Sequence, residues 1–557
     1  MRFQIIVTPS TVGETHTDAP YGALYIAASL IEQKHDVRIE NYDIEKFDYA
    51  DLFRRIKEYK PDVIGISGVI VMSYKFVKDV SLYIKKEFPN IKIIVGGGVG
   101  SAAELLLRNS GVDVIVVGEG DLTIKELAER IASGRSYHDI DGIAFKEDDA
   151  VIKTPPRVPI RDLDVLNYPA FDSINISEYF IDIKATITGL RHYKNPDVRL
   201  FEPKRSKKML RILLSRGCIS KCAFCYRPTP GFRHFSFDYI FDYIEHLMDK
   251  FNINIFSFGD ECFAPNKAWN WKFLEELHKR KLDIMFQIMG MRVDVVDYDI
   301  LRAFKEAGCF IIFYGFESGS QKMLDIMEKK VTVEQNLETA RLTKRTGIYT
   351  SPNFLFGMPG ETTKTVCETI DFLKRLNYGP YWHQYVYALA VPGTPLYNYA
   401  KLTGLIQDEN KYLEKLFYTS AQNLINTDAF INFTSEPYET VKNWPKLLDD
   451  ELLKYYHKNK IIYFIHKYLK PNYLFYSLRR FGVRKTLKDI WNYILKKAQK
   501  TKYVLIPIAQ ESTFERNRYT DLVRKFINGN NERLNLRQII KRIEDDNRAI
   551  IERKIQV

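Results

Sequence analysis

Three cysteines stand within eight residues in the stretch SRGCISKCAFCYRP, and their spacing is the strongest chemical signal of the chain. They are Cys218, Cys222 and Cys225, half of the six cysteines among 557 residues. Three thiolates on one loop can hold three irons of a cubic [4Fe–4S] cluster, for which cysteine thiolate is the usual ligand. The fourth iron then has no protein ligand. Because an open iron is a reactive position, we predict that these cysteines are both metal ligands and catalytic residues.

Two other uses of the cysteines are less well supported. A structural zinc site normally has four ligands, often as two C-x₂-C pairs, and only one such pair is present, Cys222 with Cys225. A disulfide framework would leave an odd thiol in the same loop, and the start of the chain does not read as a secretory signal. The remaining cysteines are solitary in apolar or helical contexts that are typical of core positions, namely Cys262, Cys309 and Cys367.

Residues 1–135 alternate short apolar runs with stretches of helical spacing. Nearly continuous apolar strands separated by helices predict a doubly wound parallel sheet covered on both faces. Ligands of such sheets bind beyond the carboxyl ends of the strands, where this chain places small and polar residues. These candidates for ligand binding are Ser67, Gly96, Gly97, Gly98, Gly118, Glu119 and Gly120. A dinucleotide fingerprint is absent, since GGGVGS has serine where the last glycine of G-x-G-x-x-G should stand.

The alternation resumes from residue 209 to about residue 400 in longer units. Six strand-like runs, each separated from the next by a helical stretch, predict a partial (β/α)₆ barrel. The carboxyl ends of the strands form the functional rim of a parallel barrel. Since the cysteine loop follows the first of these strands, we expect it on that rim. The other strand ends supply polar and glycine-containing turns with the motifs GDE, MR, GFESGS and GMPGET.

The cysteine spacing and the ordered rim motifs resemble the radical S-adenosylmethionine (SAM) enzymes. The N-terminal phrases PYGALYIAASL, ISG, VGGG and VVGEGD resemble the cobalamin (B12)-binding domain found ahead of many of those enzymes. Two departures stand out: D-x-H-x-x-G is missing, so no histidine is offered to cobalt, and Val99 stands where relatives often carry a polar residue. The resemblance implies three cofactors, a [4Fe–4S] cluster, SAM and cobalamin, with the N-terminal turn residues named above contacting cobalamin.

The resemblance also implies a role for each residue on the rim of the barrel. A carboxylate of Asp260 or Glu261 accepts from the α-amino group of SAM, and Arg292 pairs with its carboxylate. Glu317 and Ser318 bond the ribose, Leu355 packs on adenine, and Gly357 permits close approach. Phe224 precedes the last cysteine of the loop and is assigned to the same site. The sequence does not identify the substrate.

The implied reaction is reductive cleavage of SAM followed by methylation of an unactivated carbon. The same cofactors would also serve a cyclase, an oxidase or a carbon–carbon coupling enzyme, and a non-catalytic iron–sulfur or corrinoid carrier is the third alternative. Expected partners are a small-molecule, lipid or peptide substrate and an electron donor such as flavodoxin or ferredoxin. Few cysteines and no export signal predict a cytoplasmic protein.

Four regions follow from these patterns: a cobalamin-binding α/β domain at 1–140, a proline-rich connector at 141–205, the radical SAM barrel at 206–400 and a mostly helical C-terminal region at 401–557. The net charge of +12 is concentrated in residues 451–500, which hold thirteen Lys or Arg against two acids. A helical cap on the barrel is the first interpretation of this segment, and peripheral contact with an anionic membrane the second. Because the rest of the chain is nearly balanced, nucleic-acid binding is not expected.

Overall fold

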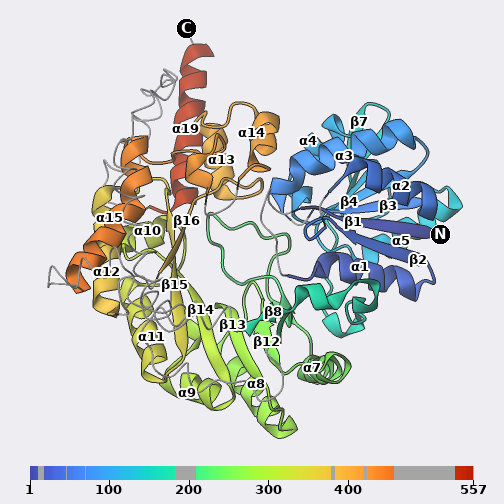
Figure 1. The fold of residues 1–557 in the computed structure, drawn as a ribbon. Helices are drawn as coiled ribbons and strands as arrows, with labels where there is room; N and C mark the ends of the chain where they lie inside the picture. Colours follow the sequence, from blue (N-terminus) through green and yellow to red (C-terminus); the bar gives the residue numbers. More distant parts are fainter. Residues whose placement is uncertain are drawn as a thin grey trace, which may run out of the picture.

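The computed structural model describes residues 1–9, 18–45, 47–68, 70–183, 208–377, 383–419, 423–456 and 534–555. These residues form two α/β bodies, each built on a seven-stranded sheet. Figure 1 shows the N-terminal body beside the open end of the second sheet, with the C-terminal helices packed along one side of that sheet.

The first sheet has the strand order β2-β1-β3-β4-β5-β6-β7. The first five strands in sequence are parallel, which confirms the predicted doubly wound sheet, whereas β6 and β7 add an antiparallel edge. The strands are β1 (Arg2–Val7), β2 (Asp36–Asn41), β3 (Val63–Ser67), β4 (Lys92–Gly96), β5 (Val114–Val116), β6 (Ile143–Glu147) and β7 (Ala150–Lys153). The boundary predicted at residue 140 therefore precedes two strands of this sheet.

Helices cover both faces of this sheet because neighbouring strand residues point to opposite sides. Ile5 packs in a cluster with residues of α1 and α5, while Ile6 belongs to the cluster that contains residues of α2, α3 and α4. The helices are α1 (Tyr21–Glu32), α2 (Tyr49–Tyr59), α3 (Tyr74–Glu87), α4 (Ala103–Asn109) and α5 (Asp121–Ser133). The sequence analysis did not predict α5, which begins directly at the last glycine turn.

The second sheet has the order β16-β15-β14-β13-β12-β9-β8, and six of its strands are parallel. This confirms the partial (β/α)₆ barrel; β8 (Ile181–Asp182) is an antiparallel addition at the edge. The parallel strands are β9 (Lys208–Ile212), β12 (Ile255–Phe258), β13 (Met285–Met291), β14 (Cys309–Glu317), β15 (Tyr349–Phe356) and β16 (Gln384–Tyr387).

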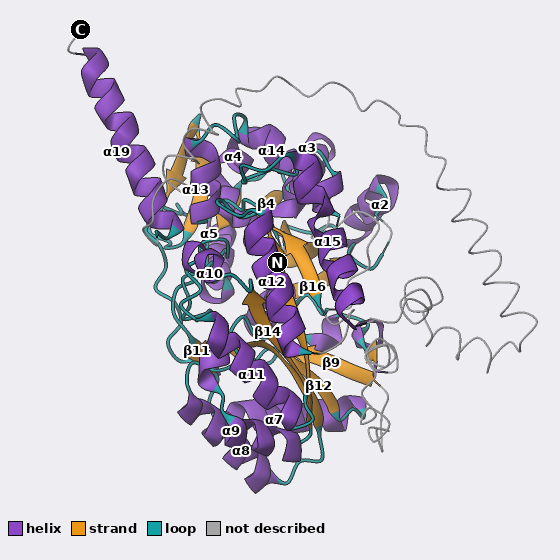
Figure 2. Cartoon of the chain, turned by 90° about the vertical axis from the view of Figure 1, so that its left-hand side faces the viewer, coloured by secondary structure: helices purple, strands orange, loops and turns teal. Residues whose placement is uncertain are grey.

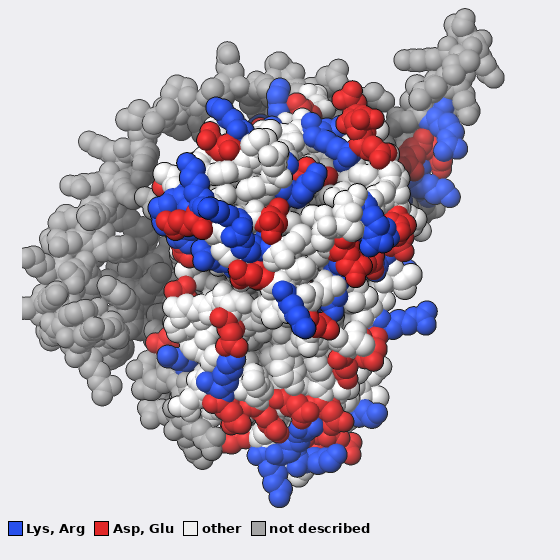
Figure 3. Space-filling model, turned by 90° about the vertical axis from the view of Figure 1, so that its right-hand side faces the viewer, with Lys and Arg blue, Asp and Glu red and all other residues white. Residues whose placement is uncertain are grey.

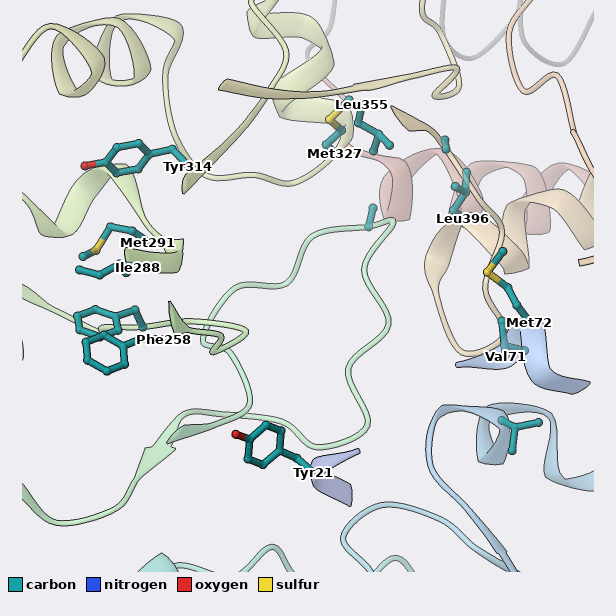
Figure 4. Packing of buried hydrophobic residues seen from close by; sticks show 14 of the residues in the cluster. Tyr21, Val71, Met72, Phe258, Ile288, Met291, Tyr314, Met327, Leu355 and Leu396 are labelled. Carbon is teal, nitrogen blue, oxygen red and sulfur yellow. The ribbon is translucent and has the colours of Figure 1, made fainter. Parts of the chain in front are cut away.

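Helices lie along the outer face of the curled second sheet (Figure 2). Each of these helices either starts after a residue whose side chain caps it or directly follows a turn at the end of a strand. For example, the Ser236 hydroxyl accepts a hydrogen bond from the backbone N–H of Tyr239. The helices are α7 (Phe237–Phe251), α8 (Lys267–Arg280), α9 (Tyr298–Glu306), α10 (Gln321–Ile326), α11 (Val333–Arg345) and α12 (Thr363–Leu376). The two bodies share one continuous core: Figure 4 shows Tyr21, Val71 and Met72 of the first and Phe258 and Leu355 of the second in the same buried cluster.

The region predicted as a connector is divided between the two sheets. Residues 143–153 pair with the first sheet, β8 pairs with the second, and residues 184–205 lie outside the described part of the chain. The region from 401 onward is mostly helical where it is described: α13 (Pro395–Leu402) ends in it, and α14 (Glu409–Leu416), α15 (Tyr438–Tyr456) and α19 (Leu536–Ile555) lie within it. Most of the basic segment at 451–500 falls in residues 457–533, outside the described residues. None of the described helices is both long and apolar enough to cross a bilayer.

Candidate functional site

The three cysteines lie on a loop between two short antiparallel strands, β10 (Ser215–Arg216) and β11 (Arg233–His234). The middle of this loop is fixed to two other parts of the chain. The backbone N–H of Ala223 donates to the carbonyl of Met327 at the end of α10 (2.9 Å), and the N–H of Leu396 in α13 donates to the carbonyl of Ala223 (3.1 Å). The loop thus holds all three cysteine side chains on one cavity of about 220 Å³.

The thiols of this loop differ in their electrostatic surroundings. The Cys218 sulfur accepts hydrogen bonds from the Cys262 thiol and from the backbone N–H of Ser220 (3.4 Å), and these bonds lower the pKa of Cys218. Burial raises the pKa of Cys222 and raises that of Cys225 to about 11. Metal cations displace the protons of such thiols when they bind.

The cysteine side chains fit a cluster better than a single metal ion. Among the residues that the structure describes, no three His, Cys, Asp or Glu side chains converge closely enough to hold one ion. In a cubic cluster each thiolate binds a different iron, so the thiolates stand farther apart than around one zinc. Three thiols that line one cavity are the donor set that such a cluster needs.

Four of the residues predicted to bind SAM line the same cavity: Phe224, Glu261, Arg292 and Glu317. The Arg292 guanidinium donates to the Ser220 hydroxyl (2.5 Å) and to Asp294 (2.9 and 2.5 Å), which fixes it against the cysteine loop. Opposite charges therefore face one another around the cysteines, as a zwitterionic amino-acid group would require.

Lys329 lines this cavity as well, although the sequence analysis did not single it out. Its Nζ lies 2.9 Å from Glu317 Oε1. Burial opposes the charge of Lys329, yet the carboxylate of Glu317 and the sulfur of Cys222 outweigh burial and raise its pKa. Nothing in the sequence around Lys329, which reads MEKK, indicates a site residue. Only the fold brings Lys329 from the turn after α10 to the cysteines.

Four predicted SAM residues are absent from the lining of this cavity: Ser318, Leu355, Gly357 and Asp260. Ser318 is buried and shares its hydroxyl with Thr369 (3.3 Å) and the N–H of Ser320 (3.1 Å). The side chain of Leu355 lies in the hydrophobic core, beside Met327 in Figure 4. Gly357 has a φ of 85°, and its N–H donates to the buried Glu361 carboxylate (2.5 Å). Ser318, Leu355 and Gly357 support the ends of β14 and β15 through contacts inside the protein.

Asp260 has partners within the protein and is not exposed toward the cysteines. Its Oδ1 accepts from the N–H of Leu214 (2.8 Å) and the hydroxyl of Ser215 (2.7 Å), which ties the end of β12 to the start of the cysteine hairpin. Burial raises the pKa of Asp260 to about 7 against these hydrogen bonds. Between Asp260 and Glu261, only Glu261 reaches the cavity of the cysteines.

A second cavity, of about 440 Å³, lies between the carboxyl edge of the first sheet and the rim of the barrel. It is lined by six of the seven predicted turn residues, Ser67, Gly96, Gly97, Gly118, Glu119 and Gly120. Gly98 is missing from the lining because it starts a 3₁₀ turn at Gly98–Ala102 that leads away from the edge.

The walls of this second cavity fit a large planar ligand. No atom lies within 4 Å of the point where a Cβ would stand on Gly22 or Gly118, so side chains there would enter the cavity. Glycine and apolar side chains make up most of the lining, and among its described residues there is no histidine. Both observations suit a corrinoid that receives no histidine from the protein. Gly22, at the start of α1, is a further lining residue that the sequence analysis did not select.

Glu119 also has partners outside the first sheet. Although it lines the cavity, its two carboxylate oxygens accept from Arg233 (2.7 and 3.0 Å) and from the N–H of Ile160 (2.8 Å). The neighbouring Asp121 accepts a two-bond fork from Arg216 (2.7 and 3.0 Å). These contacts join the first sheet to the cysteine hairpin.

Comparison with known proteins agrees with both halves of this site. Residues 212–373 match the family model of the radical SAM superfamily, and residues 10–128 match that of the B12 binding domain. An uncharacterized methyltransferase, PH0819, of Pyrococcus horikoshii is 28% identical over 441 residues, covering 77% of this chain and 90% of the relative. An anaerobic magnesium-protoporphyrin IX monomethyl ester cyclase of Rubrivivax gelatinosus is 28% identical over 58% of this chain and 56% of its own length.

Two solved structures share the arrangement of the domains. OxsB, a cobalamin-dependent SAM radical enzyme, superimposes with a TM-score of 0.59 at 17% identity, covering 100% of this chain and 81% of that one. The radical SAM methyltransferase TsrM of Kitasatospora setae gives a TM-score of 0.55 at 18% identity, over 72% and 77% of the two chains. These likenesses show the fold, while the two family models cover the cysteine loop and the glycine edge, the carboxyl edge of the first sheet with its turns at 96–98 and 118–120. The chain thus combines a domain of the radical SAM superfamily with an N-terminal B12-binding domain.

Proposed function

We propose that this enzyme cleaves SAM reductively at a [4Fe–4S] cluster and, with cobalamin, methylates an unactivated carbon of its substrate. One observation carries the proposal: Glu261 lines both cavities, so the cysteine site and the glycine edge open onto the same stretch of the barrel rim. A substrate between them would face both cofactors. The bound groups supply the reductive cleavage of SAM and the carriage of a methyl group.

The residues of the chain bind and orient these groups. Cys218, Cys222 and Cys225 hold the cluster, and the cations of Arg292 and Lys329 face the carboxylate of SAM. Glu261 accepts from its amino group. The Asp260 carboxyl positions the cysteine hairpin through Leu214 and Ser215 and does not contact SAM, which revises the role that the sequence suggested.

The proposal includes the following division of the chain and its partners. The cobalamin-binding unit runs from residue 1 to about 153, the barrel from 206 to 400 and the helical region from 401 onward. The substrate is a small molecule, a lipid or a peptide, and the electron donor is a flavodoxin or ferredoxin in the cytoplasm. Figure 3 shows Lys and Arg interspersed with Asp and Glu on the visible face of the N-terminal body, so this face offers no single-sign surface for nucleic acid.

A second candidate function is ring closure without methyl transfer. It is favoured by the 28% identity to the anaerobic magnesium-protoporphyrin IX monomethyl ester cyclase. The two functions need the same cofactors and differ in the mass of the product. Methylation adds one CH₂ to the substrate, whereas oxidative cyclisation removes hydrogen.

The test is an anaerobic incubation of the reconstituted enzyme with hydroxocobalamin, a strong reductant, an extract of the host and SAM labelled in its methyl group. Labelled product in the extract supports methylation, and Cys222→Ala serves as the matched inactive control. Formation of 5′-deoxyadenosine with an unlabelled, hydrogen-depleted product would support cyclisation instead. No 5′-deoxyadenosine at all would favour a non-catalytic carrier and refute both enzymes.

A further inference from the structure

One arginine stands at each end of the cysteine loop. Arg216 is the last residue of β10 before the loop, Arg233 is the first residue of β11 after it, and the two are paired across the hairpin. The Arg216 guanidinium also lies 4.9 Å from the centre of the Tyr25 ring in α1. The two strands that flank the loop therefore each carry an arginine whose side chain contacts the first body.

Two carboxylates of the first body receive these arginines. Arg233 makes a bidentate ion pair with Glu119, and Arg216 makes one with Asp121. A guanidinium nitrogen of Arg216 also lies 3.7 Å from a carboxylate oxygen of Glu119. The side chains of Glu119 and Asp121 are only 8% and 5% exposed. Pairs of this burial and two-bond geometry hold orientation as well as distance. Three hydrogen bonds, two from Arg233 and one from the N–H of Ile160, already occupy most of the roughly four acceptor sites of the Glu119 carboxylate.

The same carboxylates belong to the turn that forms one wall of the second cavity. The turn Gly118–Asp121 connects β5 to α5, and its glycines face the cavity. Gly118 has a φ of 92°, a conformation that glycine adopts freely. A ligand lying against this turn restrains its backbone, and the carboxylates that the turn carries are bonded directly to the strands that flank the cysteine loop.

We propose that Glu119, Asp121, Arg216 and Arg233 form a clamp that couples occupancy of the cobalamin cavity to the order of the cysteine loop. This coupling rests on the proposed function, in which the cavity holds cobalamin. Glu119 and Asp121, which also line the cavity, are then positioning residues for the cluster. Since coupling between two binding sites is reciprocal, a formed cluster strengthens cobalamin binding by the same factor.

The experiment measures amide hydrogen exchange of peptides within residues 217–232 in the full chain without iron, with and without hydroxocobalamin. In the wild type we expect hydroxocobalamin to slow this exchange several-fold. In the double variant Glu119→Gln/Asp121→Asn, compared at saturating hydroxocobalamin, we expect the slowing to disappear. Arg233→Lys keeps the charge and loses the fork, and it should show a smaller slowing. If the double variant does not fold, the exchange measured in Arg233→Lys tests the coupling by itself.

The matched control is Glu104→Gln, which removes ion pairs to Lys153 and Arg108 inside the same body and leaves the clamp intact. It should slow exchange as the wild type does. Equal slowing in the wild type and in Arg233→Lys and the double variant would overturn the coupling and leave the proposed function standing. A wild type that binds no hydroxocobalamin would overturn the cobalamin part of the proposed function and the coupling with it.

Discussion

Substitutions of Gly22 should affect stability and cobalamin binding differently. A small side chain should raise the stability of the fold, and a large one should lower the affinity for cobalamin. Gly22 is the second residue of α1 and lines the cobalamin cavity, and its φ is not positive. No atom lies within 4 Å of a Cβ built on it. Alanine favours a helix over glycine by about 0.5–1 kcal/mol. We therefore expect Gly22→Ala to raise the melting temperature by on the order of 0.5–1 °C.

A larger side chain at the same position should weaken binding. Gly22→Leu projects into a cavity of about 440 Å³ that the corrinoid has to fill. Forcing extra atoms into a filled site costs about 1–3 kcal/mol, which corresponds to an affinity about 5- to 150-fold lower. Thermal unfolding followed by circular dichroism gives the first effect, and titration with hydroxocobalamin followed by visible absorbance gives the second.

Ala132→Leu is the matched control, since Ala132 is exposed near the end of α5 and away from the cavity. It should leave the affinity unchanged. A folded Gly22→Leu variant that binds hydroxocobalamin as tightly as the wild type would refute the placement of cobalamin against α1.

Three further predictions test the barrel. Cys222→Ala should abolish the visible absorbance and iron content of the reconstituted cluster, whereas Cys309→Ala, buried in β14, should keep both; a normal cluster in the first variant would contradict the ligand assignment. Arg292→Gln should weaken SAM binding about tenfold in equilibrium dialysis by loss of one charged hydrogen bond, while the exposed Arg302→Gln should not. Burial raises the pKa of Asp260 from 3.8 to about 7, so the folded state holds a proton that the unfolded state releases, and stability should fall by about 1.4 kcal/mol per pH unit between pH 5 and 7. Asp260→Asn should lack this part of the slope in urea unfolding, and equal slopes would contradict the assigned burial.

The cysteine site and the order of the barrel strands could be predicted because their signals are local. The cysteines lie in eight consecutive residues, and each barrel strand is an apolar run that ends in its own turn. The same holds for the glycine edge of the first sheet. Chemistry that is carried by one loop, or by the end of one strand, is visible before any tertiary structure is known.

The partners of Asp260 and Glu119 could not be predicted, since they come from distant segments. Asp260 accepts from residues 45 and 46 positions away, and Glu119 from an arginine 114 positions away. A carboxylate beside a glycine turn has the same sequence whether it contacts a cofactor or another domain. For Leu355 the reason is different: its side chain lies on the core side of β15, and the motif GMPGET does not reveal which side a residue faces.

The docking of α19 on the cysteine loop has a consequence for the timing of synthesis. Arg537 of this helix donates to the carbonyl of Lys221 and pairs with the buried Glu328, and Leu536, Ile539 and Ile543 are buried at the same end. Arg537 follows Lys221 by 316 residues. At about 5–20 residues per second, the ribosome delivers it roughly 15–60 s after the cysteines. During that interval the loop has left the ribosome without its last contact, so iron delivery before the chain is finished would meet an incomplete site.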